Sequence, residues 1–224
     1  MILAIDSSSK TASTALVRGG ALIAESFQNT GLTHSQTLVP MIEDMLKNTG
    51  VSPGDISRVI VTNGPGSFTG LRIGVAAALG WAEARGIPCE GVSTLEAAAR
   101  AGAQQERLIC AVMDARRSEV YNALFMPSDG GITRLCEDRA MPLERLEREL
   151  DGREVFLVGD GAAMCAGQPG RVLAARPHVS AFGAALCALA GNVRPAENIV
   201  YLRLPQAERE LLERNTSGGI NNEC

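Results

Sequence analysis

The 224-residue sequence has few aromatic residues, few histidines and no excess of positive charge. It contains one Trp, two Tyr, five Phe and two His, and its formal net charge at pH 7 is -4. Proteins that bind nucleic acid by themselves usually carry a basic surface, because phosphate contacts dominate their affinity. Scarce aromatic side chains also leave few platforms on which bases could stack. Direct binding of RNA or DNA by this chain alone is therefore not expected.

Paired cysteines and long apolar runs are also missing. The two closest of the six cysteines, Cys89 and Cys110, are 21 residues apart, so no CxxC pair for zinc or dithiol chemistry is present. The opening residues show no basic segment followed by an extended apolar run, and no stretch is long enough to span a membrane. Scattered thiols of this kind are typical of a reducing compartment, which predicts a cytoplasmic protein.

The first part of the chain is predicted to begin with three strands. Apolar runs and rough alternation mark them over residues 2–6, 11–17 and 21–27. A fourth, buried strand is predicted over 57–64, and a short fifth one over 87–93. Three strands followed by alternating helices and strands are typical of an α/β fold.

Three helices are predicted between and after these strands. The first runs from Thr33 to Gly50, with Thr33 and Gln36 at capping-box spacing, and Pro40 is expected to kink it. The second covers 69–86 with Ser67 or Thr69 as its N-cap, and the third covers 94–103.

A repeat links the two halves of the chain. The segments ILAIDSSSKTASTALV and CAVMDARRSEVYNALF align with a shift of 114 − 6 = 108 residues, so that Asp6 meets Asp114. Each reads as an apolar strand, an aspartate, a turn and an alternating strand. A spacing of about half the chain predicts two lobes of related topology.

The second half is predicted to continue with strands over 130–138 and 154–162 and helices over 141–152, 180–192 and 204–215. We therefore expect an N-terminal lobe over 1–105 and a C-terminal lobe over 106–214. The last helix is expected to pack back on the first lobe, and residues 215–224 are expected to form a flexible tail.

The glycine-rich stretch NGPGSFTGLRIG, residues 63–74, lies between a strand and a helix, where phosphate-binding loops often occur. Gly70 is followed by Leu71 and Arg72 rather than by the Lys-Ser/Thr of a Walker loop. The spacing also fails the GxGxxG fingerprint, and Pro65 stands where a GxSxG elbow needs glycine. A tight turn with close helix packing through Gly70 and Gly74 is the simpler interpretation.

The only histidines, His34 and His178, are 144 residues apart, and Leu38 stands four residues after His34. No helical HxxxH metal pair is therefore present. Neither histidine lies in a context typical of a Ser-His-Asp hydrolase.

Two aspartate turns and one glycine turn resemble the phosphate and adenosine turns of the fold shared by actin, sugar kinases and Hsp70. They contain the residues Asp6, Ser7 and Ser8, then Asp114 and Arg116, and last Gly159 and Gly161. In those ATPases the second turn is rich in glycine, so that backbone amides can approach phosphates. Here it carries Ala115, Arg116 and Arg117, so the nucleotide site is expected to be degenerate.

An ordered set of strings extends the resemblance: LAIDSS, THSQTLVPMI, GPGSFTGLRIG, GVSTLEA, MDARRSEVY and YLRLPQAERE. Together these strings resemble the TsaB (YeaZ) family, over residues 2–210. The resemblance implies an α/β fold of the actin-like ATPase (ASKHA) superfamily, with two RNase H-like lobes that each hold a mixed sheet flanked by helices. It also implies a paralogue of the enzyme TsaD.

What the resemblance implies about function is a non-catalytic subunit. TsaB-like proteins dimerise with TsaD and, with the ATPase TsaE, support threonylcarbamoyl transfer to the adenosine next to the tRNA anticodon. The HxxxH metal helix of TsaD matches His34 and Leu38 here, so neither a catalytic residue nor a metal site is carried over. No cofactor is expected on the chain alone, ATP or ADP could lie at or near the complex, and tRNA would be met only through that complex.

The resemblance places the partner interface on the helices after Thr33 and Thr69. The expected contact residues are His34, Leu38, Met41, Ile42, Met45, Gly70, Leu71, Arg72, Gly74, Val75, Ala78 and Leu79. The same apolar stripes could equally be buried against this chain's own sheet, and an exposed stripe would also favour a homodimer of the free chain.

The alternative function is a small actin-like ATPase or phosphotransferase that uses Asp6 or Asp114 to organise magnesium. A peptidase ranks third, because no nucleophile-base pair is visible.

Overall fold

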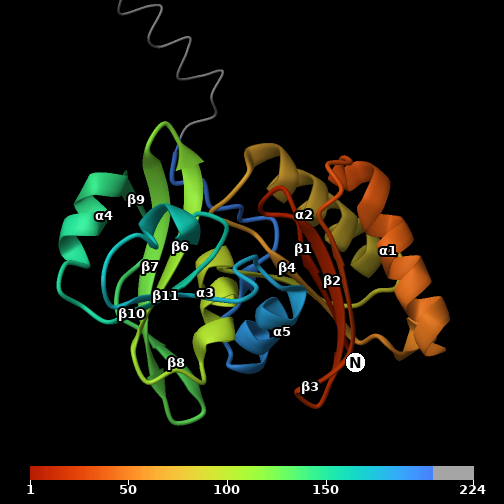
Figure 1. Cartoon of the computed structure of the whole chain (residues 1–224). Helices are drawn as coiled ribbons and strands as arrows, with labels where there is room; N and C mark the ends of the chain where they lie inside the picture. The colour runs from red at the N-terminus through yellow and green to blue at the C-terminus, as the bar shows by residue number, and fades with distance from the viewer. Residues whose placement is uncertain (204–224) are drawn as a thin grey trace, which may run out of the picture.

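The structure, a computed structural model, describes residues 1–203 and consists of five layers (Figure 1). Helices α1 (His34–Thr49) and α2 (Phe68–Glu83) cover the outer face of the first sheet. Helices α3 (Thr94–Ala99) and α5 (Ala181–Leu189) lie between the two sheets, and α4 (Leu143–Glu149) covers the outer face of the second. Short 3-10 turns occur at Pro53–Asp55, Arg100–Gly102 and Ala162–Cys165.

The first sheet has the strand order β12-β5-β4-β1-β2-β3. β1 pairs antiparallel with β2 and parallel with β4, so the aspartate turn follows the central strand of the sheet. The strands are β1 (Ile2–Asp6), β2 (Ala12–Arg18), β3 (Ala21–Gln28), β4 (Arg58–Thr62), β5 (Cys89–Val92) and β12 (Arg194–Pro195).

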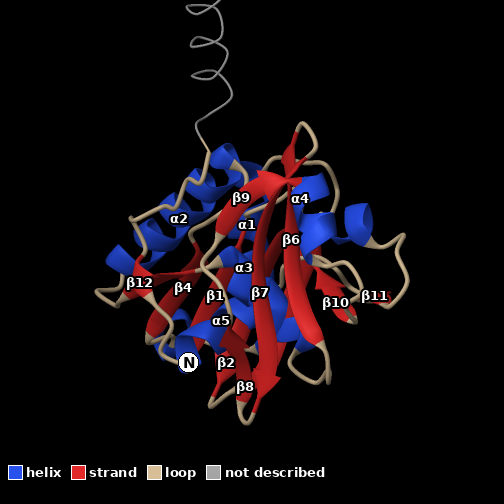
Figure 2. Ribbon diagram, turned by 90° about the vertical axis from the view of Figure 1, so that its left-hand side faces the viewer, coloured by secondary structure: helices blue, strands red, loops and turns tan. Residues whose placement is uncertain are grey.

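The second sheet has the order β11-β10-β6-β7-β8, and β9 pairs with β7 (Figure 2). Its central strand β6 pairs antiparallel with β7 and parallel with β10. The strands are β6 (Leu108–Arg116), β7 (Glu119–Ser128), β8 (Gly131–Arg134), β9 (Arg139–Pro142), β10 (Val155–Val158) and β11 (Arg171–Leu173).

The predicted repeat is confirmed by the two sheet orders. β5-β4-β1-β2-β3 corresponds strand for strand to β11-β10-β6-β7-β8, with the same parallel and antiparallel pairings. The hairpin that ends in Asp6 thus has its counterpart in the hairpin that ends in Asp114. The predicted fold class, an actin-like pair of RNase H-like lobes, is present.

Both faces of each central strand are buried, because helices cover both faces of each sheet. In β1, Leu3 and Ile5 pack with α1 and α2, whereas Ile2 and Ala4 face the layer between the sheets. That middle layer is one apolar cluster, in which side chains of α3 and α5 contact both sheets.

The two halves of the chain exchange helices in this middle layer. α3 comes from the first half but packs on β6 and β7, whereas α5 comes from the second half and packs on β1, β2 and β4. β12 also returns to the first sheet, where it pairs with β5. The first sheet is therefore complete only when residues from both halves are present.

Several local details differ from the sequence-based expectations. β9, β11 and β12 were not predicted, because two to four residues are too few to show a period. Thr33 is the N-cap of α1, but its hydroxyl donates to the Gln36 side chain at 2.8 Å rather than closing a capping box with the backbone. Residues 204–215, predicted as a helix, and the predicted tail lie outside the described residues.

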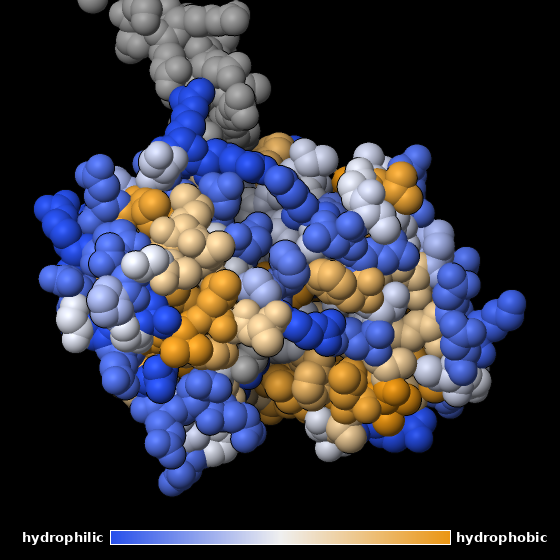
Figure 3. Space-filling view, in the orientation of Figure 1, coloured by the Kyte–Doolittle hydropathy of each residue, from blue (hydrophilic) through white to orange (hydrophobic). Residues whose placement is uncertain are grey.

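Within the described residues no helix is long and apolar enough to cross a membrane. Apolar side chains gather in the lower middle of the face shown in Figure 3, over α5 and β3. The large exposed apolar residues of these two elements are Leu22, Ile23, Phe27 and Leu189.

Candidate functional site: the interlobe cleft and the outer helices

The glycine loop before α2 owes its composition to close backbone packing on the first aspartate turn. A Cβ atom at Gly66 would overlap the carbonyl oxygen of Ser8, and one at Gly70 would overlap that of Ser7. A Cβ atom at Gly74 would meet the Ser7 hydroxyl. Ser67 is the N-cap of α2, its Oγ accepting from the Gly70 amide at 3.2 Å, as predicted. The glycines seat α2 directly on the β1–β2 turn, which is the packing interpretation of the sequence.

Most of the residues predicted for the partner interface lie in this chain's own core, the alternative that the sequence left open. The side chains buried on the sheet-facing sides of α1 and α2 are those of Leu38, Met41, Ile42, Met45, Leu71, Val75 and Ala78, together with Gly70 and Gly74. α1 packs against β2 and β3, and α2 packs against β4 and β1. This packing removes more apolar area from water than an outward position would. His34 and Leu79 are half-buried, and Arg72 is exposed.

The first aspartate turn is buried. Asp6 is 0 % exposed, and its Oδ1 accepts from the hydroxyls of Thr62 at 2.6 Å and Ser8 at 2.7 Å. Its Oδ2 has no partner. Burial raises the pKa of Asp6, although the hydrogen bonds from Thr62 and Ser8 oppose that change.

The second aspartate turn has an unusual backbone. Arg116, Arg117 and Ser118 have φ angles of 67°, 54° and 56°, in the left-handed region that favours glycine. Asp114 holds the turn, because its Oδ1 accepts from the Arg116 amide at 2.7 Å and its Oδ2 pairs with the Arg116 guanidinium at 3.2 Å. The turn keeps a glycine-like conformation without any glycine.

The third turn, at residues 159–161, lies against β6. Cβ atoms at Gly159 and Gly161 would overlap the β6 backbone, at Val112 and at Met113–Asp114. Between them, Asp160 accepts from the Asp114 amide at 3.2 Å. Burial raises the pKa of Asp160, and the neighbouring carboxylates of Asp114 and Asp6 raise it further.

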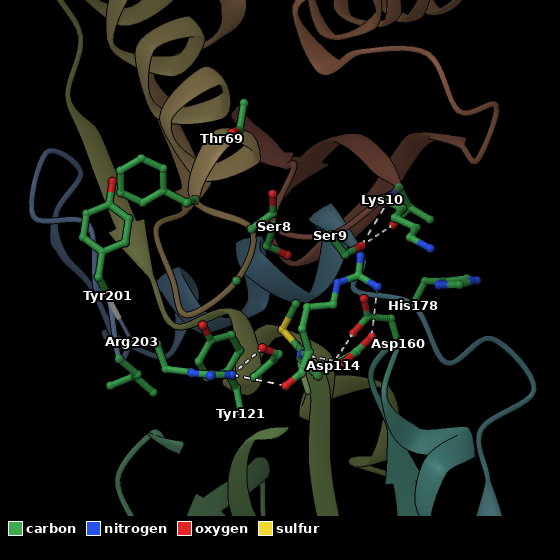
Figure 4. A pocket seen from close by; sticks show the side chains of 18 of the residues that line it. Ser8, Ser9, Lys10, Thr69, Asp114, Tyr121, Asp160, His178, Tyr201 and Arg203 are labelled. Atoms are coloured by element: carbon green, nitrogen blue, oxygen red, sulfur yellow. Dashed lines mark hydrogen bonds and ion pairs between the residues drawn. The ribbon is translucent and has the colours of Figure 1, made fainter. Parts of the chain in front are cut away.

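These turns meet at a cleft between the lobes with a volume of about 650 Å³ (Figure 4). Ser8, Ser9 and Lys10 come from the first turn, Asp114 and Arg116 from the second, and Asp160 from the third. The cleft thus brings Ser8, Asp114 and Arg116 together, as predicted from the repeat, whereas Asp6, Ser7, Gly159 and Gly161 lie behind its surface. Such a volume is large enough for a small-molecule ligand.

Several backbone amides of these turns are already bonded within the chain. A phosphate cradle needs free backbone amides, but the Ser8 amide donates to Asp6, and the Ser67 amide to the Ser8 carbonyl. In the second lobe the Asp114 amide donates to the Asp160 carboxylate, and the Arg116 amide donates to the Asp114 carboxylate. The anionic side chains Asp114 and Asp160 also line the cleft, where they would repel a phosphate.

His34 makes a structural contact: its Nε2 lies 2.9 Å from the Ser9 carbonyl, to which the ring N–H donates. Four residues on, Leu38 is 1 % exposed and packs in the core. In residues 1–203 no group of three or more His, Cys, Asp or Glu side chains is arranged to hold a metal ion.

Sequence reasoning missed the residues that close the cleft near its mouth. Val200, Tyr201, Leu202 and Arg203 line the cavity, although they are far from the aspartate turns in sequence. The string YLRLPQAERE contains three of them, but its residue spacing does not indicate a binding or catalytic site. Asn63, which binds this segment, was visible only as the residue before a glycine.

The layers, the sheet orders and the paired turns define a two-lobed protein of the actin-like ATPase fold. A solved structure with this likeness is the activator of the 2-hydroxyisocaproyl-CoA dehydratase from Clostridium difficile with bound ADPNP, with a TM-score of 0.50 over 93% of this chain and 97% of that one. At 13% identity the likeness concerns the fold alone.

More similar proteins narrow the class to one family. YeaZ from Pseudomonas aeruginosa has a TM-score of 0.73 and 27% identity over 91% of this chain and 99% of its own. The tRNA threonylcarbamoyladenosine biosynthesis protein TsaB of Bacillus subtilis is 36% identical over 71% of each chain. Residues 24–163 also match the family model described as TsaD, tRNA N6-adenosine threonylcarbamoyltransferase. The chain belongs to the TsaB family.

Proposed function

We propose that the chain is a non-catalytic subunit in the formation of tRNA threonylcarbamoyladenosine. It pairs with a catalytic partner of the TsaD type and, with a TsaE-type ATPase, supports threonylcarbamoyl transfer to the adenosine next to the anticodon. The similarity to TsaB of Bacillus subtilis, a tRNA threonylcarbamoyladenosine biosynthesis protein, and the match to the TsaD family model support this pathway. The Ser8, Asp114 and Arg116 amides donate to carboxylates, and this supports a non-catalytic role.

The observation that carries the proposal is the outward face of α2. Ala76 and Gly80 are exposed, and Ala77 is half-buried. A Cβ atom at Gly80 would have nothing within 4 Å, so this chain has no packing need for a glycine there. A glycine inside a helix costs about 1 kcal/mol relative to alanine. Small residues on an exposed helix face allow a second backbone to approach closely, which explains why the cost is tolerated.

Apolar side chains extend the same face. Ile73 of α2 is half-buried, and Val39 of α1 is 48% exposed. We therefore place the partner interface on this outward face, defined by Val39, Ile73, Ala76, Ala77 and Gly80.

Reconstitution tests the proposal. A TsaD-type enzyme, a TsaE-type ATPase, threonylcarbamoyl-adenylate and unmodified tRNA are incubated with and without the chain, and the modified nucleoside is quantified by mass spectrometry. We expect product only when the chain is present. Equal product without it would overturn the proposed role. Calorimetric titration of the free chain with Mg-ATP should show no binding, and micromolar binding would favour the ATPase alternative.

A charge on the outward face tests the interface. Ala76→Glu should weaken partner binding at least about a hundredfold, because a buried, unpaired carboxylate costs several kcal/mol at an interface. Ala163→Glu, at an exposed alanine of the second lobe, serves as the matched control and should bind as the wild type does. Affinity is measured by calorimetry, and circular dichroism verifies the fold. Wild-type affinity of a folded Ala76→Glu would remove α2 from the interface.

A further inference from the structure

The segment that follows α5 runs from the first lobe to the second. β12 pairs with β5 at the edge of the first sheet, and residues 196–203 then pass the glycine loop and the start of α2. In Figure 1 the described chain ends beside the upper ends of β6 and β7. We call residues 194–203 the strap.

The strap is fastened to the first lobe through Asn63, which is 0 % exposed. The Asn63 Oδ1 accepts from the Arg194 guanidinium at 2.6 Å. Its Nδ2 faces the carbonyls of Pro195, Ala196 and Asn198 at 3.1, 3.3 and 3.1 Å. The Val200 amide donates to the Asn63 carbonyl at 2.8 Å. One buried side chain thus holds the backbone of several strap residues.

Close packing continues at the glycine loop and at α2. A Cβ atom at Gly64 would overlap the Val200 carbonyl, so the loop needs glycine there to admit the strap. The Tyr201 ring lies 4.9 Å from that of Phe68, and its hydroxyl accepts from the Arg72 guanidinium at 3.0 Å. The same guanidinium lies 3.7 Å above the Phe68 ring. The strap is therefore tied to the first turns of α2.

The far end of the strap is bound to the second lobe by Arg203. Its guanidinium donates to the carbonyls of Ala115 and, at 3.2 Å, Arg116, and it forms an ion pair with Glu119. These acceptors belong to the turn with three successive positive φ angles. Non-glycine residues keep such angles only where their surroundings hold them. Arg203 helps to stabilise this turn of the second lobe, although it belongs to a segment that is bound to the first lobe.

We propose that the strap is a clasp that fixes the opening of the interlobe cleft, with Arg203 as its fastening on the second lobe. α3 and α5 join the lobes through the middle layer, and the strap joins them at the cleft, where Val200, Tyr201, Leu202 and Arg203 form one wall. Releasing Arg203 frees that wall and loosens the β6–β7 turn and the glycine loop together.

Hydrogen exchange of the free chain tests the clasp and requires no partner. Arg203→Ala removes the hydrogen bonds and the ion pair of the guanidinium. We expect exchange to become about tenfold faster in peptides covering 114–119, 198–202 and the glycine loop 63–67, since bonds to a charged group are worth about that factor. Arg145→Ala in α4 is the matched control, because this exposed arginine of the second lobe makes no described contact. It should leave all three peptides unchanged.

Faster exchange confined to 114–119 would overturn the proposal, because Arg203 would then only cap the turn. Unchanged exchange in all three peptides would overturn it too. Arg203→Lys covers the case in which Arg203→Ala does not fold. Lysine keeps the charge opposite Glu119 but lacks the planar fork that reaches both carbonyls. Its exchange should rise in the same three peptides by a smaller factor, and a rise in only one of them would again remove the link between the lobes.

Discussion

At the scale of single residues, Asp6 is the buried carboxylate of the first turn. Three donor atoms, from Ser8 and Thr62, converge on one carboxylate oxygen, and the other oxygen is buried without a partner. A carboxylate that organised a metal would need that second oxygen within reach of the cleft. The hydrogen bonds of Asp6 tie the first turn to β4, and burial makes its charge a cost to the fold.

The charge of Asp6 predicts a pH-dependent effect of Asp6→Asn. Because the folded-state pKa is raised, mainly by burial, the wild type loses stability as pH rises from the unfolded-state pKa through the folded-state pKa. At neutral pH we therefore expect the free energy of unfolding of Asp6→Asn to be higher than that of the wild type. The gain should vanish below the ordinary pKa of an aspartate. Urea denaturation across this pH range measures it.

The matched control is Asp44→Asn, which removes the charge of an exposed aspartate of α1 and should not show the gain at neutral pH. A loss of several kcal/mol in Asp6→Asn at neutral pH would show that the charged form is favoured in the folded state. The turn would then have to be reconsidered as a site that uses a carboxylate.

The sequence indicated where the three turns lie in the chain but not which of their polar groups are hydrogen-bonded. Asp6 and Asp114 were found because the repeat aligns two hairpins, and the glycine turn at 159–161 was found by its resemblance to an adenosine turn. Bonds between distant segments could not be predicted: the Asp114 amide donates to Asp160, 46 residues away, and the Thr62 hydroxyl donates to Asp6 from 56 residues away. Asn63 and Arg203 were missed for the same reason, since their partners are distant in sequence and have no periodic pattern.

At the scale of secondary structure, α2 shows two uses of glycine in one helix. Gly70 faces the Ser7 carbonyl with no room for a Cβ atom, whereas Gly80 faces open space. Both lie in a region of normal helical φ. The first glycine is therefore required by the fold, and the second is not.

This difference predicts opposite effects of one substitution. Gly70→Ala should lower the free energy of unfolding by about 1–3 kcal/mol, because the added methyl group meets rigid backbone. Gly80→Ala should raise it by up to about 1 kcal/mol, because alanine has the higher helix propensity. Thermal and urea denaturation of the two variants beside the wild type measures both. Each variant controls for the other, and destabilisation by Gly80→Ala would mean that the exposed face already packs against something in the free chain.

Helical periodicity was enough to predict α1 and α2 but not to decide what their apolar stripes contact. Leu38, Met41 and Val75 fit a core or an interface equally well, because both remove apolar area from water. The structure assigns them to the core. The outward face could not be identified from periodicity, because Ala76 and Gly80 give almost no hydrophobic signal.

At the scale of the whole molecule, the exchange of α3 and α5 joins the lobes. A buried polar network reinforces it: Glu96 of α3 accepts from Arg100 at 2.8 Å and pairs with Arg134 of β8 at 3.3 Å. Burial raises the pKa of Glu96, but hydrogen bonds from Asn192 and Arg100 and the nearby arginine charges outweigh it and hold the pKa below its usual value. The two-lobe prediction was correct for the sheets, while the exchange of helices left no trace in the sequence pattern.

The exchanged helices predict that the chain folds as one unit. Fragment 1–105 contains five strands of the first sheet but lacks α5, which covers the inner face of β1, β2 and β4. Burying that face requires the second half, so neither 1–105 nor 106–224 should fold alone. Mixing or co-expressing the two fragments should restore structure.

The fluorescence of Trp81, the single tryptophan, reports on the first lobe, and circular dichroism reports on both lobes. In the intact chain the two signals should change together on denaturation. A cooperative unfolding transition of isolated 1–105 would show instead that the first sheet closes its core without α5.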